Sequence, residues 1–374
     1  MNDQRPMENE FAISRYITQK ASYKGIPIHG VFELTGRCNF NCRMCYVHEN
    51  KNIEAMKQKE LSTAQWLDIA KAAREKGMLF LLLTGGEVMM RQDFMELYTA
   101  LSQMGFRIVI NTNGSLLDPQ VIELFKKYPP GRVNVSLYGA DEDTYEAVCG
   151  VRAMNAVQAS IRQLKAAGIS VRLNMTLTYD NCRDMEDVYM VSQECHTLCA
   201  MSAYLFPPSR LSDTAAGSNP GRMSAEDAGC YMVERERLLM GDERFKETAL
   251  KRLKPAPPLP EPEQSEGSPS RCYAGRSSFW ITWDGKMRPC GMMTCPEADV
   301  VMDGFDLAWE KIRTDMDKVR LPRACAGCPD RILCRACAAM CQAETGTFDR
   351  KPEYVCKMTA AMKKAYREWL DCHE

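Results

Sequence analysis

The chain has 374 residues and a formal net charge of −1. Its length allows two domains of ordinary size, and its balanced charge gives no electrostatic reason to expect nucleic acid or an acidic membrane as a partner. The N-terminus lacks an apolar stretch of signal-peptide length, and the longest apolar run, near residues 78–83, is too short to span a bilayer. We therefore expect the eighteen cysteines in a reducing cytoplasm, where they are more often cluster ligands than disulfides.

Short apolar runs alternate with amphipathic helical stretches between residues 28 and 206. The expected strands are Val31–Leu34, Phe80–Thr84, Arg107–Asn111, Arg132–Leu137, Val171–Leu177 and Ala203–Phe206. The expected helices between them are Thr63–Lys76, Arg91–Met104, Pro119–Tyr128, Asp141–Val148, Ala153–Ala167 and Asp184–Leu198. Strands that alternate with helices pair in parallel, so the sequence predicts an α/β barrel or doubly wound sheet. Six units are too few for the common closed eight-stranded barrel.

Residues with known capping roles support these helix boundaries. Ser62 or Thr63 can cap the first helix, and Asp118-Pro119 can open the third. Gly77 follows the end of the first helix, where a residue with a left-handed backbone is common.

Three cysteines follow the first expected strand with the spacing Cys38-x3-Cys42-x2-Cys45. Three thiolates can hold three irons of a [4Fe–4S] cluster and leave the fourth iron open to a ligand. A zinc knot is the simplest alternative, although zinc sites usually pair two such motifs to close four ligands.

This spacing, in a loop that leaves a buried strand, resembles that of the radical S-adenosylmethionine (SAM) enzymes. The aromatic residue beside the last cysteine, Tyr46, also fits that family and is expected near the cofactor. The resemblance implies an open, partial (β/α)6 barrel of parallel strands with a [4Fe–4S] cluster on Cys38, Cys42 and Cys45. It also implies that SAM binds the open iron.

A second motif follows the second expected strand, at the end of a parallel barrel where sites are found. Thr84 is followed by Gly85, Gly86 and Glu87, and two glycines allow the backbone to approach a ligand closely. In radical SAM enzymes a GGE motif at this position meets the amino group of SAM, so the resemblance implies that role here.

Four more candidates lie on the following strands or directly after them. Asn113, after the third strand, and Ser136, on the fourth, stand where the family contacts the ribose and carboxylate of SAM. Arg172 and Asn174 on the fifth strand can serve the same site, or they can be a solvated face and a turn residue.

The chain changes character near residue 270. Charged helical stretches, Ala225–Leu239 and Glu243–Leu253, lead into a segment rich in proline, serine and glutamate that is expected to be a linker. Residues 271–374 then hold ten of the eighteen cysteines and a closing helix from about Glu353 to Leu370. We therefore expect an N-terminal extension (1–27), the partial barrel (28–215), a helical segment with linker (216–270) and a small cysteine-rich, cluster-binding domain (271–374).

The C-terminal cysteines have a pattern of their own: Cys272, then Gly285-x4-Cys290, then Cys325-x2-Cys328-x5-Cys334-x2-Cys337-x3-Cys341, and finally Cys356. This pattern resembles the SPASM extension of radical SAM enzymes and implies two auxiliary [4Fe–4S] clusters, which together need about eight thiolates. A zinc ribbon built from the two Cys-x2-Cys pairs is the alternative.

The resemblance also implies which cysteines hold each auxiliary cluster. Cys325, Cys328, Cys334 and Cys356 would hold the distal one, and Cys272 and Cys290 would hold part of the nearer one. Its remaining ligand is left open between Cys337, Cys341 and Cys295, or an iron stays open. The cysteines without ligand spacing are expected to be structural, with Cys149 also considered as a hydrogen donor: Cys149, Cys182, Cys195, Cys199, Cys230 and Cys372.

Together these resemblances imply an enzyme that generates a 5′-deoxyadenosyl radical to abstract hydrogen from its substrate. Enzymes with such an extension most often modify peptides, so we expect oxidative modification or crosslinking of a peptide or small protein, with ferredoxin or flavodoxin as external electron donor. About 27 residues precede the first expected strand, too few for a leader-binding domain, so a separate leader-recognition protein or a leaderless substrate is expected.

Two other functions stay open from the sequence. One is a small-molecule radical SAM oxidase or haem-precursor decarboxylase. The other is a non-catalytic iron–sulfur electron carrier, which the matching positions of Glu87 and Ser136 disfavour because a carrier needs no SAM pocket.

Overall fold

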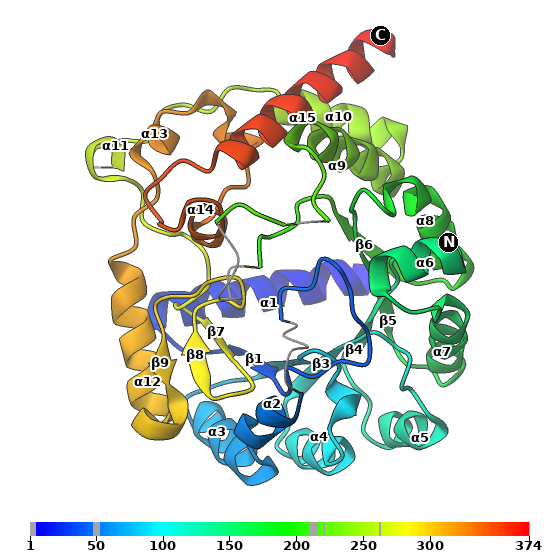
Figure 1. The fold of residues 1–374 in the computed structure, drawn as a ribbon. Coiled ribbons are helices and arrows are strands. Elements are labelled where there is room, and N and C mark those ends of the chain that lie inside the picture. The colour runs from blue at the N-terminus through cyan, green and yellow to red at the C-terminus, as the bar shows by residue number, and fades with distance from the viewer. Residues whose placement is uncertain (1–4, 48–52, 209–215, 220, 262, 374) are drawn as a thin grey trace.

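The computed structural model describes residues 5–47, 53–208, 216–219, 221–261 and 263–373. One curved sheet runs through it in the strand order β6-β5-β4-β3-β2-β1-β7-β8-β9, with helices around the outside (Figure 1). The first six strands run parallel to their neighbours, and they are β1 (His29–Glu33), β2 (Phe80–Thr84), β3 (Arg107–Thr112), β4 (Arg132–Ser136), β5 (Val171–Thr176) and β6 (Leu198–Ser202). The expected partial barrel of parallel strands is confirmed.

Helices carry the chain from each of these strands to the next and cover the outer face of the sheet (Figure 1). They are α3 (Thr63–Glu75), α4 (Phe94–Gln103), α5 (Pro119–Lys127), α6 (Glu142–Cys149), α7 (Met154–Ala166) and α8 (Met185–Glu194). Ser62 caps α3 in a capping box with Gln65, and Asp118 caps α5 ahead of Pro119, as the sequence predicted.

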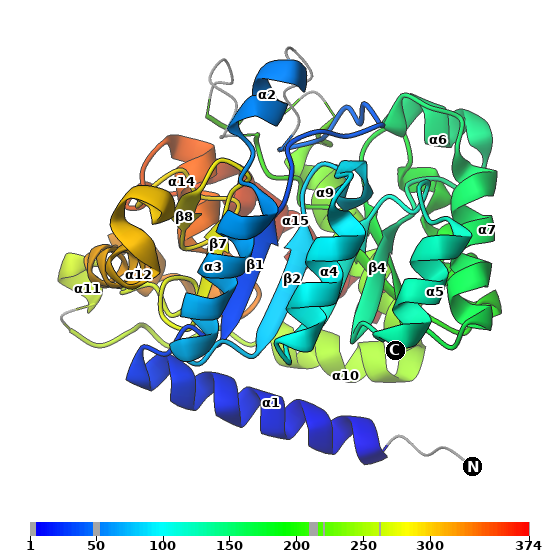
Figure 2. The ribbon, with the colours of Figure 1, turned by 90° about the horizontal axis from the view of Figure 1, so that it is seen from below.

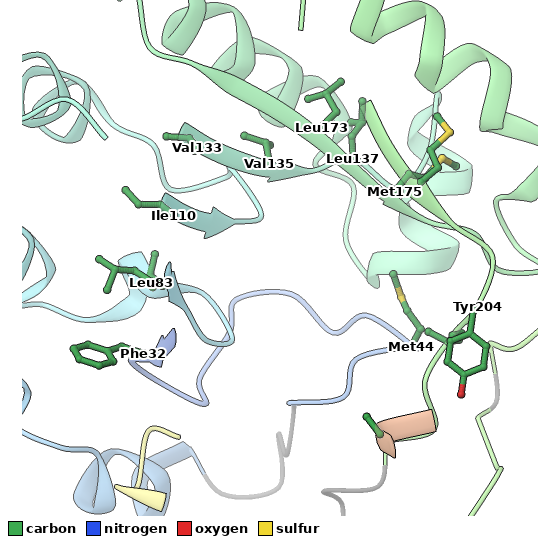
Figure 3. Packing of buried hydrophobic residues seen from close by; sticks show 14 of the residues in the cluster. Phe32, Met44, Leu83, Ile110, Val133, Val135, Leu137, Leu173, Met175 and Tyr204 are labelled. Atoms are coloured by element: carbon green, nitrogen blue, oxygen red, sulfur yellow. The ribbon is translucent and has the colours of Figure 1, made fainter. Parts of the chain in front are cut away.

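Successive side chains of each strand point alternately to the hydrophobic core and to the interior of the barrel. Side chains such as Leu83, Ile110, Val133 and Val135 pack in the hydrophobic core (Figure 3). Because successive residues of a strand point to opposite faces, Arg132, Asn134 and Ser136 of β4 lie on the inner face of the barrel.

The sixth strand begins earlier than the sequence suggested. It was expected at Ala203–Phe206, whereas β6 spans Leu198–Ser202. The preceding helix, expected to reach Leu198, ends at Glu194, and His196 has a left-handed backbone (φ 47°) in the turn that follows. The apolar run at 203–206 is largely buried beyond the strand, while half-exposed Leu198 gave no strand signal.

The C-terminal third continues the same sheet. The strand β7 (Ser278–Ile281) pairs in parallel with β1, and β8 (Lys286–Arg288) and β9 (Ala298–Asp299) extend it in antiparallel fashion. Phe279 of β7 packs against Phe32 of β1 and against α12 (Val300–Asp317). The sheet thus crosses the domain boundary expected near residue 270, and the division into domains stays a prediction.

The other helices lie at the ends and on one side of the barrel. Figure 2 shows α1 (Arg5–Lys24) across the end where the strands begin, and α2 (Ile53–Lys59) at the end where they finish. The cysteine-rich segment contains the short α13 (Arg323–Ala326) and α14 (Ala338–Thr345), and α11 (Glu263–Glu266) precedes it. None of the helices in the described part of the chain is long and apolar enough to span a membrane.

The closing helix α15 (Glu353–Cys372) packs against α9 (Ala225–Met240) and α10 (Asp242–Arg252) around one buried carboxylate. Glu236 is 1% exposed, and its carboxylate pairs with Arg252 at 2.7 Å and with Arg235 at 3.2 Å. The Tyr366 hydroxyl of α15 also donates a hydrogen bond to it. This carboxylate therefore links three helices through buried polar contacts.

We predict that Glu236→Gln destabilises the protein by about 3–5 kcal/mol, because it leaves two largely buried guanidinium groups without a countercharge. Urea unfolding of the variant and the wild type measures the difference. Glu234→Gln, at an exposed position of the same helix, is the matched control. A loss of stability no larger than that of the control would contradict the role given to Glu236.

Candidate active site

A cavity of about 410 Å³ lies at the carboxyl ends of the barrel strands. It is lined by the three predicted cluster ligands, Cys38, Cys42 and Cys45, and by other residues expected near the cofactor: Tyr46, Gly85, Gly86, Asn113, Ser136 and Asn174. The segment 38–47, which carries the triad, thus meets the ends of five further strands, β2 to β6, at one place. Glu87 and Arg172 are not in the lining.

Buried ion pairs hold the turn from which the cysteine loop begins. Glu60 is 6% exposed, pairs with Arg37 at 2.9 Å and accepts a hydrogen bond from the Thr35 hydroxyl. Arg91 lies 3.9 Å from the same carboxylate and donates to the Leu34 carbonyl at 3.0 Å. Leu34, directly after β1, and the first residues of the loop are therefore fixed by charge-assisted hydrogen bonds.

The two glycines of the GGE motif permit close packing of two backbone segments. The Gly86 N–H donates to the Thr35 carbonyl at 2.8 Å, and the Glu87 N–H donates to the Arg37 carbonyl at 2.8 Å. A Cβ atom at Gly86 would lie 2.2 Å from the Arg37 carbonyl oxygen, and one at Gly85 would lie 2.5 Å from that of Thr35. Side chains at these positions would push the GGE segment away from the cysteine loop.

Glu87 is buried, and its carboxylate faces the end of β3. It accepts hydrogen bonds from the Thr112 hydroxyl at 2.9 Å and from the Asn113 N–H at 2.7 Å. Burial raises the pKa of this carboxyl, and the hydrogen bonds from Asn113 and Thr112 act against that rise. The predicted contact between Glu87 and the amino group of SAM stays a prediction, while the structure shows that the carboxylate orders the segment that carries Asn113.

Asn113 lies between the cysteine loop and the cavity. Its Nδ2 donates to Asn39 Oδ1 at 2.9 Å and approaches Cys38 Sγ at 3.8 Å. Its Oδ1 accepts hydrogen bonds from the N–H and the hydroxyl of Ser115. Asn113 therefore orients the first cysteine of the triad as well as lining the cavity, a role that its position after a strand did not reveal.

Arg172 acts on the cavity through Asn174. The Arg172 Nε–H donates to Asn174 Oδ1 at 3.1 Å, one side-chain layer below the cavity. Because a guanidinium can only donate, the Asn174 amide is oriented with its oxygen towards Arg172 and its NH2 group away from it. The floor of the cavity thus offers a donor at this strand end.

A chain of hydrogen bonds orients the polar side chains of the neighbouring strands in the same way. Arg132 Nε–H donates to Asn134 Oδ1 at 2.9 Å, and Asn134 Nδ2 donates to Asn111 Oδ1 at 2.7 Å. Asn111 Nδ2 then approaches the Thr84 hydroxyl at 3.4 Å. Because Arg132 can only donate, each hydrogen bond of this chain is donated in the direction of Thr84. The Thr84 hydroxyl accepts the last one and can therefore donate its own proton.

A second cavity, of about 310 Å³, lies in the C-terminal region. Seven of the cysteines predicted as auxiliary-cluster ligands line it: Cys272, Cys325, Cys328, Cys334, Cys337, Cys341 and Cys356. Burial raises the pKa of the Cys325 thiol to about 11, with the nearby thiolates of Cys334, Cys356 and Cys328 adding to the rise. Cys325 therefore lies near the other three of these thiols in the lining of the cavity.

The remaining predicted ligands differ in their surroundings. Burial raises the pKa of Cys337, against hydrogen bonds from the backbone of Met340 and Ala339, and the charge of Cys272 adds to it. Cys341 is fully buried, and its pKa is raised to about 12 by burial and then by neighbouring thiolates, Cys325 first. Cys290 and Cys295 are outside the lining, and Cys295 Sγ accepts a hydrogen bond from Gln342 at 2.8 Å.

The thiols of both cysteine groups line cavities of the protein. In the part of the chain that the structure describes, no three His, Cys, Asp or Glu side chains are placed to hold one metal ion. The cysteines surround cavities, as a group of four irons and four sulfides requires, because each of its irons takes a separate thiolate. The residues present therefore fit [4Fe–4S] clusters.

Sequence reasoning missed several residues of the first cavity. Tyr145 of α6 and Met201 and Ser202 of β6 line it. The two β6 residues were missed because the strand was placed too late, and Tyr145 lies on a helix with no motif. Cys149, considered as a hydrogen donor, is fully buried and is outside the lining.

Comparison with known proteins places these features in a wider context. Residues 32–190 match the model of the Radical SAM superfamily. The AdoMet-dependent heme synthase of Methanosarcina barkeri is 24% identical over 333 residues, which cover 86% of this chain and 94% of that protein.

Two solved structures share the fold over most of the chain. Streptococcus suis SuiB bound to precursor peptide SuiA has a TM-score of 0.63 and 15% identity, covering 95% of this chain and 82% of that one. Native anSMEcpe with bound AdoMet and Cp18Cys peptide has a TM-score of 0.65 and 14% identity, covering 91% of this chain and 97% of that one.

Proposed function

Since residues 32–190 of this chain belong to the radical SAM superfamily, we propose that it binds a [4Fe–4S] cluster on Cys38, Cys42 and Cys45 and SAM in the adjoining cavity. A cluster with SAM on its open iron supplies a 5′-deoxyadenosyl radical that abstracts hydrogen from a substrate. The observation that carries the proposal is the meeting of the three thiols with the carboxyl ends of the parallel strands in one cavity.

The residues around this cavity have separate tasks in the proposal. The close-packed Gly85 and Gly86 present backbone to the amino group of SAM, supported from behind by Glu87. Asn174, with its oxygen oriented towards Arg172, offers its NH2 group to an acceptor such as the SAM carboxylate. Ser136 and Tyr46 line the rest of the wall.

The seven-cysteine cavity supports auxiliary clusters. The proximity of Cys325 to Cys328, Cys334 and Cys356 supports these four as the ligands of one cluster. The proximity of Cys337 to Cys272 supports Cys337 as a ligand of the other, with Cys290 as a further candidate. A zinc ribbon built from the two Cys-x2-Cys pairs is the alternative.

For the substrate, we propose a peptide or small protein that is oxidised or crosslinked, with an external electron donor such as ferredoxin or flavodoxin. The shared fold with peptide-bound SuiB and anSMEcpe supports this choice. A separate leader-recognition protein belongs to the same proposal.

A small-molecule oxidase or decarboxylase is the second candidate, favoured by the match of 86% of this chain to an AdoMet-dependent heme synthase. The two candidates differ in what should increase SAM cleavage. Peptides encoded beside the gene should do so in the first case, and porphyrin precursors in the second.

We predict that the anaerobically reconstituted protein releases 5′-deoxyadenosine when given dithionite and SAM, because the triad leaves one iron open. Chromatography of the quenched reaction measures the product. The variant with Cys38, Cys42 and Cys45 all changed to Ala should release none, and release from that variant at the wild-type rate would contradict the proposed site.

Glu87→Ala should weaken SAM binding roughly ten- to a hundredfold, because it removes the charged acceptor that holds the Asn113 N–H. A hydrogen bond to a charged group contributes about 1.5–3 kcal/mol. Glu87→Gln keeps an acceptor for the Asn113 N–H and should retain most of the affinity. Equilibrium dialysis with labelled SAM compares the variants at equal iron content. An unchanged dissociation constant for the Ala variant would exclude Glu87 from the site, and equal weakening in both variants would assign the effect to its charge.

Three clusters predict about twelve irons per chain, of which removal of the first triad should remove about four. Cys337→Ala should lower the iron content further than Cys341→Ala, since Cys337 is the one placed beside Cys272. Iron and zinc analysis of the reconstituted variants gives the counts. A count of about one zinc and only four irons per chain would show that the C-terminal cysteines form a structural zinc ribbon and hold no auxiliary clusters. That result would not contradict the first cluster site.

A further inference from the structure

The cysteine loop is fastened to the end of helix α6. The Asn41 N–H donates to the Cys149 carbonyl at 3.0 Å, and the Arg43 N–H donates to the Val148 carbonyl at 3.0 Å. Cys42, between them, contacts the Cys149 side chain. The middle cysteine of the triad thus sits directly against the last turn of this helix, one turn after Tyr145.

Tyr145 brings a hydroxyl group to this place without a well-formed hydrogen bond. The side chain is fully buried and belongs to the lining of the first cavity together with Cys42 and Cys45. Its ring makes an edge contact with Phe40 of the cysteine loop, with centroids 6.2 Å apart. The hydroxyl oxygen is buried and makes no well-formed hydrogen bond among the described residues, and the side chain that it contacts is the Cys149 thiol.

A buried phenol whose only hydrogen-bonding neighbour is a thiol is unusual, because sulfur is a weak acceptor and replaces little of the lost hydration. Burial raises the pKa of this hydroxyl, and the charges of Cys149, Cys42 and Tyr138 and the side-chain contact with Cys149 add to the rise. Cys42 lines the same cavity as Tyr145. Tyr98 of α4 shows the ordinary arrangement, since it is equally buried and donates to the Tyr128 carbonyl at 2.7 Å.

We propose that the Tyr145 hydroxyl donates a hydrogen bond to the sulfur of Cys42, or to a cluster sulfide beside it, once the first cluster is bound. This inference rests on the proposed function, because it needs the cluster on the triad. Tyr145 is then a positioning residue that tunes the cluster through its sulfur ligands rather than a group that reacts with the substrate.

The expected effect follows from charge. One-electron reduction makes the cluster and its sulfurs more negative, so a donor to sulfur stabilises the reduced state and raises the reduction potential. Loss of the hydroxyl should therefore make the first cluster harder to reduce, with its ligands unchanged.

The test is a redox titration of the first cluster, followed by its electron paramagnetic resonance signal without SAM, in a background where the C-terminal cysteines are intact. Tyr145→Phe should shift the midpoint to a more negative potential at unchanged iron content. Tyr98→Phe, which removes an equally buried hydroxyl away from the cavity, should leave the midpoint unchanged. The cluster-free Tyr145→Phe protein should melt closer to the wild type than cluster-free Tyr98→Phe, since only the weak contact with the Cys149 thiol is lost.

A second variant covers the case in which Tyr145→Phe does not assemble the cluster. 3-Fluorotyrosine at position 145 is a more acidic, stronger donor and should shift the midpoint in the opposite direction, to a less negative potential. A midpoint that moves with neither variant would overturn the inference and leave Cys149 as the partner of the hydroxyl. Absence of any cluster from the wild-type protein would instead contradict the proposed function, so the two failures are distinguishable.

Discussion

The buried ion pairs of Glu60 with Arg37 and Arg91 are the contacts on which the candidate site depends. They fix the turn after β1, and with it the start of the loop that carries Cys38, Cys42 and Cys45. The other end of the loop is fixed by backbone hydrogen bonds to the end of α6. Removing one partner of a buried pair leaves an uncompensated charge, which costs far more than an exposed pair gains. The loop therefore has one position relative to the strand ends.

In the described part of the chain, the strand ends that meet this loop carry amides and no charged side chains at the cavity. No Asp, Glu, Lys or Arg is among the described residues that line the first cavity, and the arginines of β4 and β5 lie one layer below. Arg132 and Arg172 instead set which way the amides of Asn134 and Asn174 point. The cavity is thus lined by amide dipoles. Their orientation is set by the guanidinium groups in the layer below, which can only donate hydrogen bonds.

The sequence was sufficient for the barrel and for the residues with distinct spacing. Periodic apolar runs and capping residues located β1–β5 and their helices, and the cysteine spacing identified the triad loop, because these signals depend on local sequence. The start of β6, the pairing of β7 with β1 and the inward position of Tyr145 were not predictable, since each depends on tertiary packing. Glu87 shows the same limit: its motif located it at the site, but only the structure shows its carboxylate turned towards Thr112 and Asn113.

The central claim is that SAM binds the open iron of a cluster held by the triad. Electron–nuclear double resonance on the reduced protein, with SAM labelled with 15N at its amino group, tests it most directly. The account predicts a strong coupling from this nitrogen that is absent when Cys38, Cys42 and Cys45 are changed to Ala. A reduced cluster in the wild-type protein that shows no coupling to the label would contradict the account.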